Sequence, residues 1–183
     1  MFRIALASCA ALALAACSSG SDDVDADGDG KISNEEAQTA AAKVRRLEAG
    51  EYKMSMELLE LEDPAMKPEE IEQAKSFFSA MGGMAPAKCM SEEEANEGLV
   101  GVAEGMQEGD CTMESLTSNE DGMNGTMTCK GQNGPAKVTM DTTSTGTESE
   151  MTMRVVEPNG SGGEKTVAMK VTMTRTGDCT PAE

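Results

Sequence analysis

From Cys111 to Met173 the sequence repeats one pattern, in which apolar residues recur at intervals of two or four and the residues between them are mostly Thr, Ser, Glu or Lys. Val167, Met169, Val171 and Met173 show it most clearly. Successive side chains of a β-strand point to opposite faces, so the pattern predicts strands with one Met-rich face and one polar face. Turn-like segments at 119–122, 131–135, 144–147 and 158–163 separate five such strands. We expect these strands to form an antiparallel meander.

The residues before this region predict one further strand and three helices. Residues 51–61 alternate in the same way, whereas residues 34–47, 68–81 and 91–106 carry apolar side chains at helical spacing. The expected fold class is α+β: a curved antiparallel meander sheet of about six strands with helices packed on one face, the Met-rich face. We expect the helix that carries Phe77 and Phe78 to cover that face.

Residues 1–16 contain one basic residue, Arg3, and then an apolar run that ends in small residues. This pattern is typical of a secretory signal peptide, and the run is shorter than the roughly 20 apolar residues that span a bilayer. The segment Leu14-Ala15-Ala16-Cys17 resembles the bacterial lipobox, in which the chain is cut before the Cys and the Cys is acylated. Cys17 is therefore expected to anchor the protein to a membrane. Ser18, where Asp would favour the inner membrane, points to the outer membrane, facing the periplasm.

The mature chain is strongly acidic. Once the signal peptide and its Arg3 are removed, 14 basic side chains remain against 33 acidic ones. Such a surface repels phosphate groups, so we expect no nucleic-acid partner. The chain also lacks His, which is the commonest general base and transition-metal ligand, and it has no Cys-x-x-Cys pair. With no candidate catalytic site, we expect a protein that is not an enzyme.

Four cysteines remain in the mature chain beside Cys17, and an even number in an oxidising compartment predicts two disulfides. Folding the first hairpin of the meander about Glu120 places Cys111 opposite Cys129. Directly opposite residues have β-carbons roughly 4.5 to 5.5 Å apart, which is close enough for a disulfide after slight adjustment. By elimination, Cys89 pairs with Cys179.

The order of several short motifs resembles a bacterial family known as domain of unknown function 3617. These motifs are Ala49-Gly50-Glu51-Tyr52, Lys88-Cys89-Met90-Ser91, Asp110-Cys111, Thr128-Cys129 and Gly177-Asp178-Cys179. The resemblance covers roughly Gly50 to Cys179 and implies a periplasmic domain with four cysteines. It implies no activity and no catalytic residue.

Residues 25–36 match the twelve-residue calcium loop of EF-hands. The expected ligands are carboxylate oxygens of Asp25, Asp27 and Asp29, the backbone carbonyl of Lys31, Ser33 directly or through water, and two oxygens of Glu36. Gly30 permits the sharp turn, Ile32 occupies the apolar position, and the helix from Asn34 corresponds to the exiting helix of the motif. The predicted cofactor is one Ca²⁺ ion, because calcium takes six to eight oxygen ligands in a flexible shell.

Two features weaken this site. The chain has a polar tether in place of an entering helix, and it has no second loop to pair with Ile32. A lone loop should bind calcium with a dissociation constant on the order of 10⁻⁴ to 10⁻³ M. The competing interpretation is an acidic, solvated tether without bound metal.

The Met-rich face allows three interpretations. It can be the core of the domain, a surface for an apolar ligand such as a lipid, or a Cu(I) site at Met54 and Met56 or at Met151 and Met153. The core is favoured because burial against a helix needs no further partner.

The predicted organisation is a signal peptide (1–16), a lipidated tether (17–24), an EF-hand-like calcium loop with its exiting helix (25–48) and a disulfide-bonded α+β domain (49–183). The expected function is that of a non-enzymatic envelope lipoprotein with one weak calcium site. The alternative is a carrier of an apolar ligand that uses the Met-lined sheet face. An apolar cavity beneath the helices would favour the carrier, since carriers leave room for their ligand.

Overall fold

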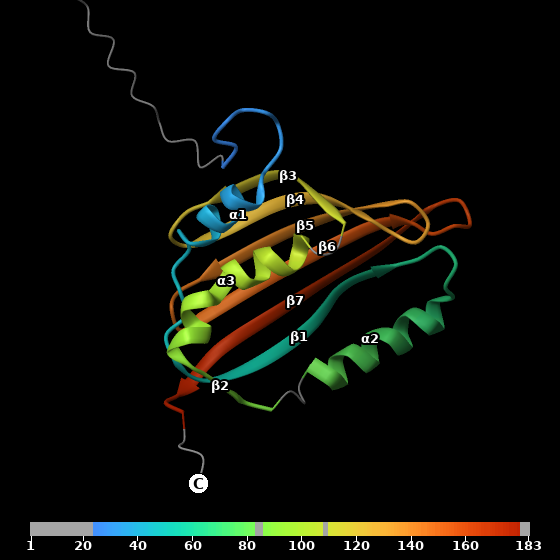
Figure 1. The fold of residues 1–183 in the computed structure, drawn as a ribbon. Coiled ribbons are helices and arrows are strands. Elements are labelled where there is room, and N and C mark those ends of the chain that lie inside the picture. Colours follow the sequence, from blue (N-terminus) through green and yellow to red (C-terminus); the bar gives the residue numbers. More distant parts are fainter. Residues whose placement is uncertain (1–23, 83–85, 108–109, 180–183) are drawn as a thin grey trace, which may run out of the picture.

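The computed structural model describes residues 24–82, 86–107 and 110–179. The predicted signal peptide, Cys17 and most of the tether lie outside these residues. The described residues form seven strands and three helices (Figure 1). They are α1 (Asn34–Ala41), β1 (Gly50–Glu62), α2 (Pro68–Gly82), β2 (Lys88–Met90), α3 (Glu92–Gln107), β3 (Cys111–Ser118), β4 (Gly122–Lys130), β5 (Pro135–Ser144), β6 (Glu148–Pro158) and β7 (Glu164–Gly177).

All seven strands belong to one antiparallel sheet with the order β2-β1-β7-β6-β5-β4-β3. The predicted α+β class and the meander from β3 to β7 are therefore confirmed. Two details differ from the prediction. The sheet has seven strands because residues 88–90 pair with the start of β1, and it is not strongly curled. A three-residue strand shows no alternation of side chains, so the sequence pattern did not reveal it.

The predicted register holds in the part of the first hairpin that lies away from its turn. Cys111 lies opposite Cys129 and Met113 lies opposite Met127. The register shifts by one residue between Met113 and Ser115. From there to the turn each pair differs by one residue from a hairpin folded about Glu120, and Ser118 lies opposite Met123. Both predicted disulfides are present, Cys111 with Cys129 and Cys89 with Cys179.

One face of the sheet carries the apolar rows. In register, Met140 of β5 lies beside Met153 of β6, which lies beside Met169 of β7, and Leu58 of β1 completes the row. We call this surface the Met face. The strand β5 shows the alternation most clearly, because every second residue from Ala136 to Ser144 is buried and the residues between are exposed.

The helix α1 completes the core on the Met face. Its buried side chains are Ala37, Ala40 and Ala41, which are 2%, 0% and 4% exposed. They belong to one cluster with Leu116, Met123 and Met140, together with Val24 and Val44 from the chain on either side of α1. Small Ala side chains let the helix axis lie close to the sheet, and the long Met side chains fill the remaining space. The residues that surround the predicted calcium loop thus share a core with the sheet.

The prediction for the helix with Phe77 and Phe78 is wrong. This helix, α2, lies along β1, while α1 and α3 lie over the sheet (Figure 1). Phe77 remains 62% exposed and Met81 51% exposed. Gly82 makes the close approach to β1 possible, because a β-carbon at this position would collide with the carbonyl oxygen of Met56. Among the described residues no strand pairs with the outer edge of β1 beyond Tyr52, so α2 borders an edge that would otherwise be open.

Within the described ranges, none of the helices combines the length and the apolar character that a membrane crossing requires.

The packing of α1 predicts that an enlarged side chain at Ala40 destabilises the sheet domain. Ala40→Leu adds three carbons at a position with no exposed surface, and overpacking of this kind costs about 1 to 3 kcal/mol. Thr39→Leu is the control, because Thr39 is exposed and surface substitutions change stability by roughly 0.5 kcal/mol or less. Urea unfolding of both variants measures the difference. Equal stability of the two would mean that α1 does not pack in the core.

Candidate metal centre

The loop before α1 is closed by its last acidic residue, Glu36. Ser33 is the N-cap of α1, and Glu36 completes a capping box with it. The Glu36 Oε2 atom accepts hydrogen bonds from the backbone N–H of Ser33 at 2.8 Å and from its hydroxyl at 2.7 Å. The other oxygen, Oε1, accepts from the backbone N–H of Ala26 at 2.8 Å. Glu36 therefore joins the end of the loop to its second residue.

These hydrogen bonds keep Glu36 charged. The backbone and then the hydroxyl of Ser33, followed by the backbone of Ala26, lower the pKa of the Glu36 carboxyl below its usual value. The stabilisation from these bonds is therefore present above the pKa that the Glu36 carboxyl has in the unfolded chain. It is lost as the pH falls through the lowered pKa of this carboxyl in the folded chain. At neutral pH the group is a carboxylate, which is the form that binds metal.

The three Asp residues fold the loop upon itself. Asp25 accepts from the backbone N–H groups of Gly28 at 2.8 Å and of Gly30 at 2.9 Å. Asp27 accepts from the N–H of Asp29 at 3.1 Å, and Asp29 accepts from the N–H of Lys31 at 2.8 Å. Gly28 and Gly30 have φ angles of 71° and 77°, a region that glycine enters without steric cost.

The predicted site residues come together only in part. Carboxylate oxygens of Asp25, Asp27 and Asp29 lie within 4.8 Å of one another. Oxygen ligands sit about 2.3 to 2.6 Å from a calcium ion, so two ligands on opposite sides are separated by about 5 Å. The three Asp residues thus have the spacing of ligands to one ion. The Ser33 hydroxyl instead bonds to Glu36, so these two predicted ligands act here as helix-capping partners.

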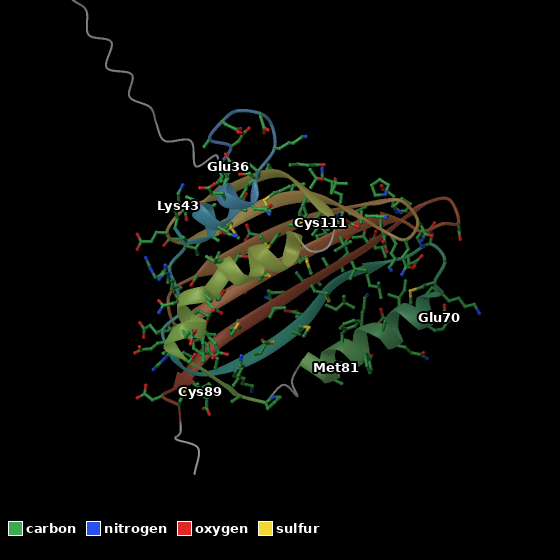
Figure 2. The ribbon with its side chains drawn as sticks, in the orientation of Figure 1. Glu36, Lys43, Glu70, Met81, Cys89 and Cys111 are labelled. Atoms are coloured by element: carbon green, nitrogen blue, oxygen red, sulfur yellow. A yellow bond between two sulfur atoms is a disulfide. The ribbon has the colours of Figure 1, made fainter. Side chains whose placement is uncertain are left out.

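The loop rests against the outer edge of β3. The backbone N–H of Val24 donates to the carbonyl of Leu116 at 3.2 Å, and that of Ile32 donates to the carbonyl of Met113 at 3.4 Å. A cavity of about 290 Å³ lies between the loop and the sheet. Its lining includes Asp27, Asp29 and Glu36 from the loop side and Cys111, Met113 and Met127 from the sheet. Figure 2 shows Glu36 at this end of the molecule and Cys89 at the opposite end. Sequence reasoning missed this contact, because no local pattern marks a hydrogen bond between residues so far apart in the chain.

A second cavity, of about 220 Å³, lies between α3 and the Met face. Its apolar lining consists of Leu47, Met90, Ala95, Leu99, Met151, Val171 and Met173. The helix is broken at Gly98, where φ is 44°, and a β-carbon at this position would meet no atom within 4 Å. Gly98 also lines the cavity.

The charged residue at this cavity is Glu94. Its carboxyl accepts from Lys88 Nζ at 2.7 Å and from the backbone N–H of Ser91 at 2.8 Å. These two contacts, that with Lys88 first, lower the pKa of Glu94 to about 2. The cavity therefore has mostly apolar walls and one carboxylate, which is paired with Lys88.

The two Met-x-Met pairs considered for copper lie on different strands. In register, Val171 of β7 lies between Met56 of β1 and Met151 of β6. Met151 packs against the core cluster, whereas Met56 is 39% exposed. The backbone does not bring the two pairs into direct contact.

The chain belongs to the family described as protein of unknown function DUF3617, which matches residues 47–179. This match confirms the resemblance seen in the sequence. It begins after α1, so the loop and α1 precede the matched residues. No curated protein and no solved structure matches the chain.

Proposed function

We propose that this DUF3617 protein is a non-enzymatic envelope lipoprotein that binds one calcium ion in the loop of residues 25–36. The observation that carries the proposal is the convergence of the Asp25, Asp27 and Asp29 carboxylates in a loop that Glu36 closes. Carboxylate and carbonyl oxygens are the ligands that calcium takes in proteins.

Binding should rearrange only the end of the loop. Glu36 now accepts hydrogen bonds from Ala26 and Ser33, and it would exchange some of them for contacts with the ion. The ion would also offset the repulsion among four carboxylates in one short segment. Calcium should be preferred over magnesium, because magnesium is smaller, holds its water more strongly and requires octahedral geometry.

Replacement of Glu36 by Gln tests the calcium site. The change removes one charge and weakens the bidentate contact, so calcium affinity should fall by more than tenfold. Glu35→Gln is the matched control, since it removes the same charge from the neighbouring exposed residue, which lies outside the expected ligand set. Isothermal calorimetry of both variants gives the two affinities. A wild-type protein that gives no heat with millimolar calcium would refute the site, and an equal loss in both variants would reduce it to general charge attraction.

The membrane anchor is the second part of the proposal, and it is supported by the lipobox-like sequence before Cys17 and by two disulfides of the kind found in exported proteins. The expected place is the outer membrane, on the side that faces the periplasm. Acyl chains on Cys17 would hold the protein at the membrane surface.

Cys17→Ser should release the protein from the membrane. Without the thiol no acyl chain can be attached, so the variant should appear unacylated in the soluble envelope fraction. Fractionation followed by intact-mass measurement checks both points, and Cys9→Ser serves as the control because Cys9 lies within the predicted signal peptide. Membrane retention of an unacylated Cys17→Ser protein would place the anchor elsewhere.

A second candidate function, that of an apolar-ligand carrier, is favoured by the cavity under α3. Its walls are Met, Leu, Val and Ala side chains, and its volume of about 220 Å³ exceeds the roughly 150 Å³ of a cavity that holds benzene. Flexible Met side chains such as Met151 and Met173 can adapt to an alkyl chain. The Glu94 carboxylate at this cavity is paired with Lys88 at 2.7 Å, so the ion pair adds no net charge beside the apolar walls.

Filling this cavity should abolish ligand retention. Ala95→Leu places three further carbons against the cavity, whereas Glu97→Leu adds an apolar group on an exposed part of the same helix. The protein is purified from its own envelope without its acyl anchor on Cys17, and any molecule in the cavity is left in place. Native mass spectrometry should then show a retained apolar molecule, and the Ala95→Leu variant should lack it. If the wild-type protein retains nothing and does not bind a fluorescent fatty acid, the cavity is only a packing defect.

A further inference from the structure

We infer that the edge of β3 takes the place of the second loop of a paired EF-hand, so that calcium binding stabilises the entire sheet domain. This inference rests on the proposed calcium site. Its independent support is the set of contacts that join residues 24–48 to the sheet.

The first step is the pairing at the loop itself. Ile32 lies between two predicted ligand positions, Lys31 and Ser33, and its backbone N–H donates to the carbonyl of Met113. A strand at the edge of a sheet presents unpaired carbonyl groups, and β3 is the last strand on its side. Val24, just before the loop, uses the carbonyl of Leu116 on the same edge. The loop is thus held to β3 on both sides of the three Asp residues.

The second step is the connection from the ligands to the core. Glu36 is the third residue of α1, and Ala37, the next residue, is 2% exposed. One turn later Ala40 is fully buried against the cluster that includes Leu116 and Met140. An ion that fixes Glu36 therefore fixes the first turn of a helix that is part of the sheet's own core.

The third step is the attachment of the segment after α1 to two turns of the sheet. The backbone N–H of Arg45 donates to the carbonyl of Glu120 at 2.8 Å, and the Arg45 guanidinium forms an ion pair with the Glu120 carboxylate at 2.8 Å. The N–H of Glu48 donates to the carbonyl of Gly146 at 2.7 Å. These bonds attach the segment to the β3–β4 and β5–β6 turns. Stabilisation of the loop and α1 should therefore also stabilise the two hairpins that these turns connect.

The fourth step is the disulfide beside the loop. Cys111 lines the loop cavity and lies two residues before Met113, and its bond to Cys129 joins the start of β3 to the end of β4. Loss of this bond would loosen the strand edge on which the loop rests. By linkage, whatever loosens that edge also weakens calcium binding.

The size of the coupling follows from mass action. Calcium at ten times its dissociation constant lowers the ratio of unfolded to folded molecules about elevenfold when the unfolded chain does not bind it. For a chain of this size that shift raises the melting temperature by about 3 to 6 °C. A loop on an independent tether would bind the same ion without any such shift.

The experiment uses the mature, disulfide-bonded protein. Calorimetry measures calcium binding, circular dichroism follows thermal unfolding of the sheet, and amide hydrogen exchange reports on β4 and β5. We expect calcium to raise the melting temperature and to slow exchange in both strands, and Glu36→Gln to lose both effects at the same calcium concentration. Sodium chloride at matched ionic strength controls for screening, since the mature chain carries 33 acidic side chains against 14 basic ones.

Two perturbations test the β3 edge itself. Ile32→Pro removes the donor to Met113, and Ile32→Val keeps it; the first should weaken calcium binding about tenfold and the second should leave it nearly unchanged. Reduction of the two disulfides of the wild-type protein, Cys111–Cys129 and Cys89–Cys179, should weaken calcium binding in the same direction, and this test involves no substitution.

The outcomes separate the two proposals. If calcium binds but leaves the melting temperature and the exchange of β4 and β5 unchanged, the coupling is refuted and the calcium site stands. If sodium chloride or the Glu36→Gln variant shows the same thermal shift, the effect is screening and the coupling is also refuted. If calorimetry detects no calcium binding, both the site and the coupling fall.

Discussion

The contact between the Ala face of α1 and the Met face of the sheet is the interaction on which the rest of the structure depends. The chain has only four aromatic residues, so its core cannot be built around large rigid rings. Ala40 and Ala41 instead allow close approach, and Met123 and Met140 fill the space between helix and sheet. Because α1 begins where the acidic loop ends, the same contact fixes the position of the candidate metal centre.

Two kinds of feature could be predicted from the sequence: strands with a repeating apolar pattern, and contacts that depend on a single pair of residues. The alternation from Cys111 onward predicted the strands of the meander. The placement of Cys111 and Cys129 on either side of one turn predicted the register at the cysteine end of the first hairpin. Ser91 and Glu94, spaced as the capping pair of a helix start, form that cap before α3, with the Glu94 backbone N–H donating to the Ser91 hydroxyl at 3.2 Å. In each case the signal is local: it lies within one strand, at one helix start, or between two cysteines of one hairpin that are 18 residues apart.

Other features could not be predicted because their causes are remote in the chain. The apolar residues of α2 have helical spacing, but spacing does not say which surface the helix covers, and it lies along β1. The strand β2 is too short for any pattern. The acceptor of the Ile32 N–H is a backbone carbonyl of β3, a group that every residue possesses, so the sequence contains no sign of it. For the candidate site, the motif predicted which residues would be ligands. The contact of the loop with β3 became visible only in the folded structure.

The two disulfides are nested, and this arrangement divides the molecule in two. The bond between Cys89 and Cys179 closes a covalent ring that contains α3 and β3 to β7, with the bond between Cys111 and Cys129 inside it. Residues 24–82 lie outside the ring and, apart from the chain connection, are held to it by hydrogen bonds, packing and ion pairs such as that of Arg45 with Glu120. A force applied at the N-terminus would act first on Val24, which is held by its hydrogen bond to Leu116 and by its packing in the core. It would then act on the loop and α1, and only after them on β1, whose long ladder with β7 resists in shear. Under such a force the molecule would therefore unfold in a fixed order. The acidic loop would detach first, and the cross-linked sheet would unfold last.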